Sequence, residues 1–429
     1  MANLKHPPGN EGIFYPLDNS AVFIASVSGK SSPYIFRVSC ELNDIVYLPA
    51  LEEALSSVMP RFPSLSTELR SGLFWYYLEP LAKPVSLQAD TRYPVEYHSL
   101  NRRDRHLFRV RAYGNRISCE FHHILTDGSG AVEFLRSLVA TYLTRRGVSC
   151  DDWEGVKKPS SPIVPGELSD SYAELTTGKI PLPDALPAAF HLPGRRYGAH
   201  AYRVISGTVS LSAALRISRE KGVSLTELLS AIYLAALQDV HEAENPSRWH
   251  PLCVQVPVNM RRFHPSVSLR NFFLFITVSI DRRLGHYDFQ EILDRVHCLF
   301  RLNLNEKELN RQIRRNVGSE RNIVSRLFPL CVKNPVLKVV SRFAAERPFS
   351  GNLSNLQSVS MPAPFAAHIR RFDILPSRRT GIGATIGVVS WQDVLSVTVG
   401  SMAVSRAFER RFFIRCVELG MPVRVESNM

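Results

Sequence analysis

A short polar turn between an alternating segment and a helical segment restricts the fold of this 429-residue chain more than any other feature. Residues 116–122, RISCEFH, alternate apolar and polar side chains, which predicts a strand. After the turn, apolar side chains recur at helical spacing, at Leu135, Leu138, Val139 and Tyr142. A strand that passes through a tight turn into a helix, with similar segments on both sides, is typical of an α/β fold.

Two histidines and an aspartate occupy this turn, which reads HHILTDGSG. Because consecutive side chains of a strand point to opposite sides, only one of His122 and His123 can easily face a given site. Asp127 follows four residues after His123, and Gly128 and Gly130 permit the tight turn into the helix. On its own, such a histidine pair is more often structural than catalytic.

Proline usage divides the chain. Residues 159–193 contain seven prolines, about four times the average usage of ~5%. This density indicates an extended linker rather than a packed element. We therefore expect an N-terminal subdomain over residues 1–158, a linker over 159–195 and a C-terminal subdomain over 196–429.

Strand-like and helical segments occur on both sides of this linker. Before it, we expect a half-buried strand at 34–42, a helix within 48–63 that ends at Pro60, and a strand at 72–80. After it, we expect a helix at 223–240 with a capping box from Ser224 to Glu227, buried strands at 249–260 and 271–280, and a hairpin over 383–401 turned at Gln392-Asp393.

The chain has 52 Lys+Arg against 39 Asp+Glu, a net charge of +13, which favours anionic partners such as coenzyme phosphates or an acidic carrier protein. It contains no zinc-type cysteine pairs, basic heptad helix or RNA-binding signature, so we expect no nucleic acid partner. The seven cysteines are scattered, and the first residues contain no apolar signal segment. We expect a cytoplasmic protein without disulfides.

The motif His122-His123-x-x-x-Asp127-Gly128 resembles the signature of the HHxxxDG acyltransferase superfamily. This superfamily includes chloramphenicol acetyltransferase, the condensation domains of peptide synthetases, plant BAHD enzymes and mycobacterial polyketide-associated acyltransferases. Further blocks look like those of its alcohol acetyltransferase branch and follow in the same order across nearly the whole chain, at residues 61–79, 121–143, 256–273, 349–359 and 418–429.

The resemblance implies a mixed α/β fold made of two chloramphenicol-acetyltransferase-like subdomains. They would lean together in a V-shaped pseudo-dimer with a central tunnel. The acyl thioester would enter this tunnel from one face and the acceptor from the other. Both halves of the site would belong to one chain, so a monomer is sufficient.

The resemblance also assigns roles within the motif. The second histidine, His123, would be the general base that takes the acceptor's proton, and His122 is its neighbour in the motif. Histidine suits this task because its ordinary pKa of about 6.5 is close to neutral pH. Asp127 would be structural and pair with an arginine, for which Arg261 is our first candidate and Arg262 the second.

A hydrogen-bond donor from the facing half is needed for the oxyanion that forms during acyl transfer. Ser354 and Asn355 are our candidates. They belong to the stretch Ser354-Asn355-Leu356-Gln357, where the branch usually has Ser-Asn-Leu-Gly. Gln357 replaces a glycine that permits an unusual dihedral angle or a close backbone approach, so we expect altered geometry on that wall.

Three hypotheses for function remain open. The first is a cofactor-independent O-acyltransferase that moves an acyl group directly from an acyl-CoA to a small or lipophilic alcohol. The second takes the acyl group from an acyl carrier protein and forms an ester or an amide. The third is an inert member of the fold that binds a partner or lipid. We expect no metal site, because zinc needs three or four converging ligands and the adjacent histidines diverge.

Residues 301–347 contain eleven Lys+Arg and four Asp+Glu, and their second half interleaves apolar and basic side chains. Two interpretations stay open for this segment. It forms a helical layer that closes the tunnel, or a surface that makes peripheral contact with anionic lipid. The second interpretation would indicate a lipophilic substrate.

Overall fold

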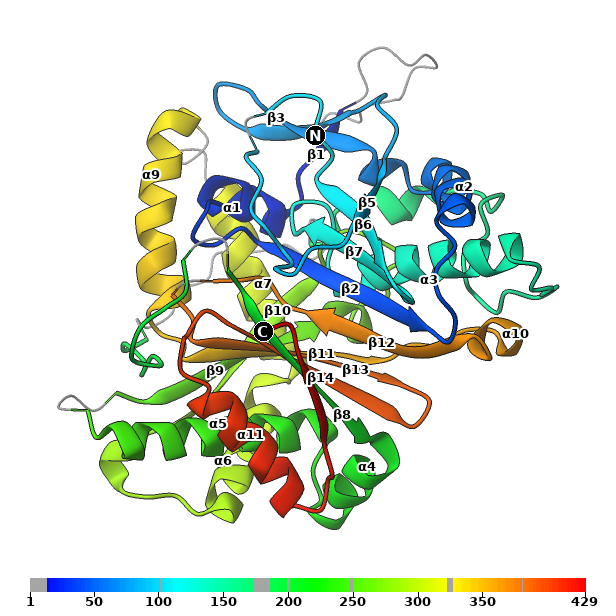
Figure 1. The fold of residues 1–429 in the computed structure, drawn as a ribbon. Coiled ribbons are helices and arrows are strands. Elements are labelled where there is room, and N and C mark those ends of the chain that lie inside the picture. The colour runs from blue at the N-terminus through cyan, green and yellow to red at the C-terminus, as the bar shows by residue number, and fades with distance from the viewer. Residues whose placement is uncertain are drawn as a thin grey trace.

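The chain folds into alternating strands and helices (Figure 1). The computed structural model describes residues 14–100, 102–172, 186–198, 201–246, 250–321, 327–379 and 381–429. The strands are β1 (Tyr15–Pro16), β2 (Ile35–Leu42), β3 (Thr67–Ser71), β4 (Tyr76–Pro80), β5 (Leu87–Ala89), β6 (Phe108–Tyr113), β7 (Arg116–His122), β8 (Arg203–Ser210), β9 (Leu252–Asn259), β10 (Phe273–Ile280), β11 (Gly351–Ser358), β12 (Ile369–Leu375), β13 (Ala384–Trp391), β14 (Val394–Ser401) and β15 (Arg424–Ser427). The helices are α1 (Asn19–Val27), α2 (Leu48–Val58), α3 (Gly128–Arg145), α4 (Leu211–Glu220), α5 (Leu225–Glu244), α6 (Phe289–Asn303), α7 (Glu306–Arg321), α9 (Leu330–Ser341), α10 (Ala363–Ala366) and α11 (Ala407–Glu418).

Two large sheets organise these elements. The first has five strands in the order β12-β2-β7-β6-β5, and the second has seven in the order β10-β9-β11-β13-β14-β8-β15. Each sheet has its own large apolar cluster of buried side chains. Helices α2 and α3 pack together beside the first sheet, and α5, α6 and α11 lie below the second sheet in Figure 1. The upper face of the second sheet is turned toward the N-terminal half.

Strand β2 is buried on both faces, whereas the sequence predicted a half-buried strand. Its apolar side chains belong to the core of the N-terminal half. Its polar face is buried because its charges are paired: the Arg37 guanidinium lies 2.6 Å from the Asp90 carboxylate and 2.7 Å from that of Glu120. The alternation was therefore real, but the polar face contacts other charged side chains instead of water.

One strand from late in the chain completes the N-terminal sheet. Strand β12 pairs antiparallel with β2 and places Phe372 opposite Cys40. It also comes so close to β13 that a Cβ at Gly387 would lie 2.3 Å from the carbonyl oxygen of Ile374. The expected division at the proline-rich segment stays a prediction. Strand β12 follows that segment in the chain but belongs to the sheet of the N-terminal half, which the sequence did not indicate.

Several expected elements of the C-terminal half are present. Helix α5 begins with the capping box, in which the Ser224 hydroxyl accepts the Glu227 N–H at 3.3 Å and the Glu227 carboxylate accepts the Ser224 N–H at 2.6 Å. Strands β9 and β10 pair antiparallel. Strands β13 and β14 form the hairpin turned at Gln392-Asp393.

Two expected elements of the N-terminal half are shorter than the sequence indicated. Helix α2 ends at Val58, and a 3-10 turn that contains Pro60 follows it, because proline has no N–H to continue the helix. The strand expected from residue 72 begins only at Tyr76, since the Gly72 N–H donates to the Trp75 carbonyl at 2.9 Å and closes a turn.

The expected linker is mostly irregular where the structure describes it, at residues 159–172 and 186–195. Its middle, residues 173–185, lies outside the described residues. All seven cysteines are free thiols. Within the described ranges, no single helix is long and apolar enough to cross a membrane, and α4 with α5 meets that test only as a pair bent by 87°.

Gln357 adopts a φ of 66°, in the left-handed region that favours glycine. The register of β11 against β13 shifts between Asn355 and Ser358, so Gln357 lies in an irregular part of the strand. Its side chain is exposed. A glycine, which the alcohol acetyltransferase branch usually has here, adopts such a φ without strain. Glutamine has a Cβ atom, so the same φ is sterically unfavourable for it.

Replacing Gln357 with glycine should raise the free energy of unfolding by about 1 kcal/mol, because glycine adopts a positive φ without a clash at Cβ. The matched control is Ser358→Gly, also exposed and one residue further along, where φ is not positive. That change should lower the free energy of unfolding by roughly 0.5–1 kcal/mol. Urea denaturation measures both, and an equal loss in the two variants would contradict strain at Gln357.

Candidate active site

A cavity of about 1870 Å³ opens between the two halves. Its walls come from α1, β2 and the start of α3 on one side, and from β9, β10 and β11 on the other. Helices α7 and α9 complete it. His123 and Asp127 both border this cavity, so the turn that the sequence singled out faces it.

His123 is held by its backbone at the end of β7. Its N–H donates to the Tyr34 carbonyl at 2.9 Å, and its carbonyl accepts from the Asn271 side-chain amide at 2.7 Å. The imidazole ring lies against Phe36, with 4.3 Å between ring centroids, and 6.0 Å from the ring of Phe273. The ring therefore has aromatic neighbours from both halves of the molecule.

Burial lowers the pKa of His123 to about 4, although the negative charge of Asp127 acts in the opposite direction. Its Nδ1 atom is buried and has no hydrogen-bond partner among the described residues. The imidazole is thus neutral at neutral pH and able to accept a proton. Aromatic packing, rather than a hydrogen-bonded carboxylate on Nδ1, keeps it in this form.

His122 points away from the cavity and is fully buried. Its Nδ1 accepts the Ile124 N–H at 3.2 Å, so Nε2 carries the proton and donates to the Ser28 hydroxyl at 3.1 Å. Burial holds the pKa of His122 well below its usual range. The two histidines diverge as the strand geometry required, and His122 contributes to the packing around the turn.

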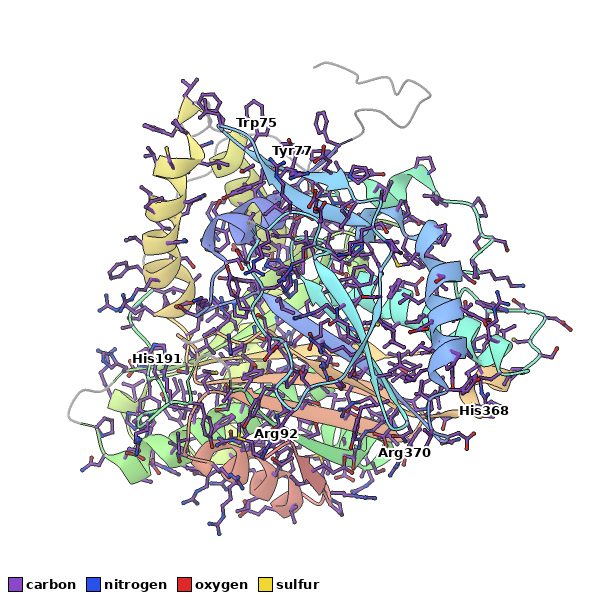
Figure 2. The ribbon with its side chains drawn as sticks, turned by 45° about the horizontal axis from the view of Figure 1, so that its top comes forward. Trp75, Tyr77, Arg92, His191, His368 and Arg370 are labelled. Atoms are coloured by element: carbon purple, nitrogen blue, oxygen red, sulfur yellow. The ribbon has the colours of Figure 1, made fainter. Side chains whose placement is uncertain are left out.

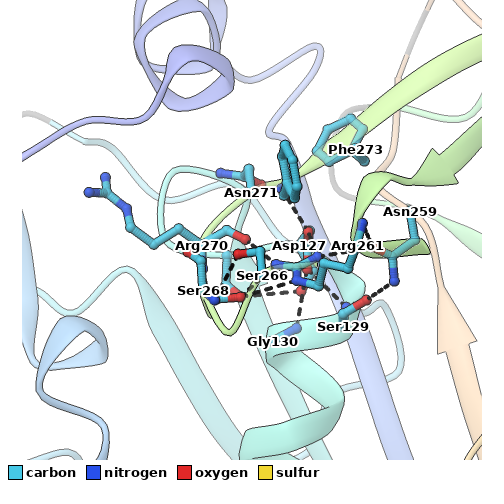
Figure 3. Close-up of polar contacts among 12 residues, drawn as sticks. Asp127, Ser129, Gly130, Asn259, Arg261, Ser266, Ser268, Arg270, Asn271 and Phe273 are labelled. Atoms are coloured by element: carbon cyan, nitrogen blue, oxygen red, sulfur yellow. Dashed lines mark hydrogen bonds and ion pairs between the residues drawn. The ribbon is translucent and has the colours of Figure 1, made fainter. Parts of the chain in front are cut away.

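Asp127 joins the turn to the opposite half of the molecule (Figure 3). Its Oδ1 accepts the N–H groups of Ser129 and Gly130 at 3.0 and 3.2 Å and so caps helix α3. Its Oδ2 accepts from the Arg261 guanidinium at 2.7 Å and from the Phe272 N–H at 2.9 Å. One carboxylate therefore fixes both the helix and the partner loop.

Arg261 is the partner of Asp127, and Arg262 is exposed to solvent. Besides Asp127, the Arg261 guanidinium donates to the carbonyls of Ser268 and Arg270, at 2.8 and 2.6 Å. It therefore shapes the loop that follows β9 while it holds that loop to the motif. Arg261, the first of the two candidates from the resemblance, is therefore the arginine that pairs with Asp127.

The same loop makes two more contacts with the turn. The Thr126 hydroxyl donates to the Leu269 carbonyl at 2.6 Å. A Cβ at Gly130 would lie 2.3 Å from that carbonyl oxygen, so glycine is required there for a close approach rather than for an unusual φ. The turn and the loop are consequently in direct backbone contact.

Asn271 and Asp18 support His123, and sequence reasoning missed both. The Asn271 amide bridges from the His123 carbonyl to the Asp18 carboxylate, 3.0 Å away, and Asp18 in turn accepts the Ala21 N–H at 2.8 Å and caps α1. Burial raises the pKa of Asp18 to about 6. The only sequence signal for Asn271 was its position in the block at residues 256–273, which looks like a block of the alcohol acetyltransferase branch.

The structure places Ser354 and Asn355 on β11, and both border the cavity. The Asn355 amide donates to the Thr226 hydroxyl at 2.9 Å, and its oxygen accepts the Gln357 N–H at 2.8 Å. The Ser354 hydroxyl has no hydrogen-bond partner among the described residues. Ser354 is therefore the more available of the two as a hydrogen-bond donor.

The cavity wall formed by β11, the strand that contains Gln357, contacts the motif directly. A Cβ at Gly128 would lie 2.4 Å from the Leu356 side chain, so Leu356 packs onto the glycine of the motif. Leu356 precedes Gln357 and lies in the irregular part of the strand. No group of three or more His, Cys, Asp or Glu side chains within the described ranges is arranged to hold a metal ion.

No protein-family model matches the sequence, and no curated protein matches it. Solved structures do match over nearly the whole chain. TRI101 of F. sporotrichioides, in complex with coenzyme A and T-2, is 11% identical with a TM-score of 0.63, over 97% of this chain and 100% of its own. This chain has the chloramphenicol acetyltransferase and condensation-domain fold.

Two further structures illustrate the range of this fold. The starter condensation domain of rhizomide synthetase RzmA, in complex with C8-CoA and Leu-SNAC, is 11% identical with a TM-score of 0.60, over 95% of this chain and 94% of its own. Polyketide synthase associated protein 5 from Mycobacterium tuberculosis is 13% identical with a TM-score of 0.57, over 94% and 98%. The expected fold is confirmed, and the alcohol acetyltransferase branch stays a prediction.

Removing the Asp127 carboxylate should lower the free energy of unfolding by about 3–5 kcal/mol, because it leaves the Arg261 charge unpaired and α3 uncapped. We expect Asp127→Ala and Arg261→Ala to be strongly non-additive, with a coupling energy above about 1 kcal/mol in a double-mutant cycle. Urea denaturation of the four proteins measures it.

The exposed pair Arg216–Glu220, with 60% and 56% of the side chains exposed, is the matched control. Its coupling should stay below about 0.5 kcal/mol. Equal coupling energies for the two pairs would show that the Asp127–Arg261 contact has no special weight.

Proposed function

We propose that this protein transfers an acyl group from an acyl-CoA to the hydroxyl of an alcohol, with His123 as general base and without an acyl-enzyme. The observation that carries the proposal is a neutral His123 at the edge of a cavity that both halves line. The proposal needs no bound cofactor, since acyl-CoA is a substrate.

The acceptor's hydroxyl oxygen attacks the thioester carbonyl carbon while His123 takes its proton. The carbonyl oxygen becomes an oxyanion, and the Ser354 hydroxyl donates to it from β11. When the tetrahedral intermediate collapses, the carbon–sulfur bond breaks and coenzyme A leaves as a thiolate. The protonated His123 then returns its proton to that sulfur, so the imidazole is neutral again after each turnover.

Coenzyme A as the source of the acyl group is supported by charge and by structural neighbours. TRI101 was solved with coenzyme A, and the RzmA domain with C8-CoA. The net charge of +13 favours a phosphorylated substrate. Three cationic side chains border the cavity and suit the phosphates of coenzyme A: Arg315 on α7, Lys333 on α9 and Arg379 in the segment that follows β12.

The walls of the cavity favour a lipophilic acceptor. Helix α9 and the residues that follow it turn a stripe of apolar side chains to the cavity, and each is about half exposed: Val332, Val336, Val339, Val340 and Phe343. Trp75, at the tip of the hairpin near the upper end of α9 in Figure 2, adds to this lining. Of the two interpretations of the segment, a helical layer that borders the cavity fits these contacts.

Acyl transfer should appear as release of free thiol that depends on both substrates. We expect release from a panel of acyl-CoAs, from acetyl to palmitoyl, in the presence of short and long alcohols. His123→Ala should reduce kcat by about 10²–10⁴-fold, since the base is lost. His286→Ala, at a histidine whose side chain is 60% exposed, should leave the rate unchanged.

Circular dichroism must show that both variants are folded. A phosphopantetheinylated carrier protein and an amine acceptor form separate arms of the same assay. Release only with the carrier would replace the coenzyme A hypothesis, and no release from any pair by folded wild-type protein would reject acyl transfer altogether.

The acid side of the pH profile should reflect the lowered pKa of His123. Because the base must be neutral, kcat/KM should fall on the acid side with a midpoint near pH 4, where His123 becomes protonated. Samples returned from each pH to neutral must recover full activity, which separates titration from unfolding. A midpoint near the ordinary histidine value of about 6.5 would contradict a buried base.

A further inference from the structure

A row of polar side chains crosses the floor of the cavity. The β-sheet register aligns Thr277 on β10 with Gln255 on β9, Gln255 with Asn352 on β11, and Asn352 with Thr385 on β13. All four border the cavity. They lie on the upper face of the seven-stranded sheet, because the alternate residues of these strands fill the core below it.

The two central members of this row, Gln255 and Asn352, have no side-chain hydrogen bond within the part of the chain that the structure describes. Gln255 is only 7% exposed, its Oε1 is buried, and neither its amide nor that of Asn352 forms a hydrogen bond with any described residue. Thr385 differs, since its hydroxyl lies 2.8 Å from that of Tyr202. A buried amide without a hydrogen bond is destabilising, and each such group in a native protein calls for an explanation.

The row lies at a defined distance from His123. Phe273, whose ring neighbours His123, is four residues before Thr277 on β10. At about 3.3 Å per residue the two positions are about 13 Å apart along the strand. Between them, Phe275 pairs with Pro257 and borders the cavity. A ligand that extends from His123 to the row would therefore cross an apolar stretch.

We propose that Gln255 and Asn352 form a second binding subsite, which holds a hydroxyl or amide group of a substrate about 13 Å from the reacting atoms. Each side-chain amide offers both a donor and an acceptor, which matches a hydroxyl or an amide. The row itself carries no cation, so a carboxylate does not suit it. The inference rests on the proposed acyl transfer and narrows its substrate class to elongated molecules with a polar group at each end.

Two sources could supply this group. One is a second hydroxyl at the far end of a lipophilic alcohol, and the other is an amide in the pantetheine arm of acyl-CoA. The chemistry of recognition is the same for both. Matched pairs of acceptors and of acyl donors distinguish them.

The experiment compares wild type with Gln255→Met, which keeps the length of the side chain and removes its hydrogen bonds. The acceptors are α,ω-diols and monoalcohols of equal chain length, and the acyl donors are acetyl-CoA and an amide-free ethyl thioacetate. If the acceptor supplies the group, wild type should prefer the diol by about tenfold in kcat/KM, and Gln255→Met should abolish that preference. If the pantetheine arm supplies it, the variant should instead lower the preference for acetyl-CoA over ethyl thioacetate by about tenfold. The part of that preference that the phosphates of acetyl-CoA provide should persist.

The matched control is Gln290→Met, the same change at an exposed position of α6, and both preferences should persist there. Calorimetric dissociation constants for the diol, the monoalcohol and coenzyme A, measured on wild type and Gln255→Met, test the subsite without turnover. Failure of acyl transfer would thus be visible separately from failure of the subsite. Equal selectivity and equal dissociation constants in wild type and Gln255→Met would overturn the inference.

Discussion

The Asp127 carboxylate is the contact on which the arrangement of the site depends. One of its oxygens caps α3, and the other receives the Arg261 guanidinium and the Phe272 N–H from the opposite half. His123 is four residues earlier on the same turn, and the side-chain amide of Asn271, next to Phe272, donates to the His123 carbonyl. The Asp127–Arg261 charge pair, together with these hydrogen bonds, therefore couples the histidine of one half to the loop of the other.

Packing around the turn also determines the chemistry available there. The aromatic neighbours of the His123 ring shield it from water, and this burial lowers its pKa to about 4. The cost is a weaker base than a solvated histidine. In the proposed acyl transfer, the benefit would be a side chain that is neutral and already oriented before substrate binds, in a cavity where electrostatic interactions with a developing oxyanion are strong. Rigid position and neutrality thus have one physical origin.

Much of the local structure could be predicted from sequence because its causes are local. Apolar spacing indicated β7 and α3, and the Ser224 to Glu227 spacing indicated the start of α5. The family pattern indicated Arg261 as a partner of Asp127. The pairing of β12 with the N-terminal sheet and the Asn271–Asp18 contact could not be predicted, because they depend on which strands and loops meet in space. The unpaired state of Gln255 likewise appears only when its neighbours in the sheet register are known.

An experimental structure of the protein with an alcohol and a non-transferable thioether analogue of acyl-CoA tests the central claim most directly. Acyl transfer by His123 predicts that both ligands meet in the cavity between the halves, with the alcohol oxygen within about 3 Å of a ring nitrogen of His123. It also predicts that the oxygen of the analogue's carbonyl lies on the side of β11. Ligands bound away from His123, or an alcohol whose oxygen cannot reach the ring, would contradict it.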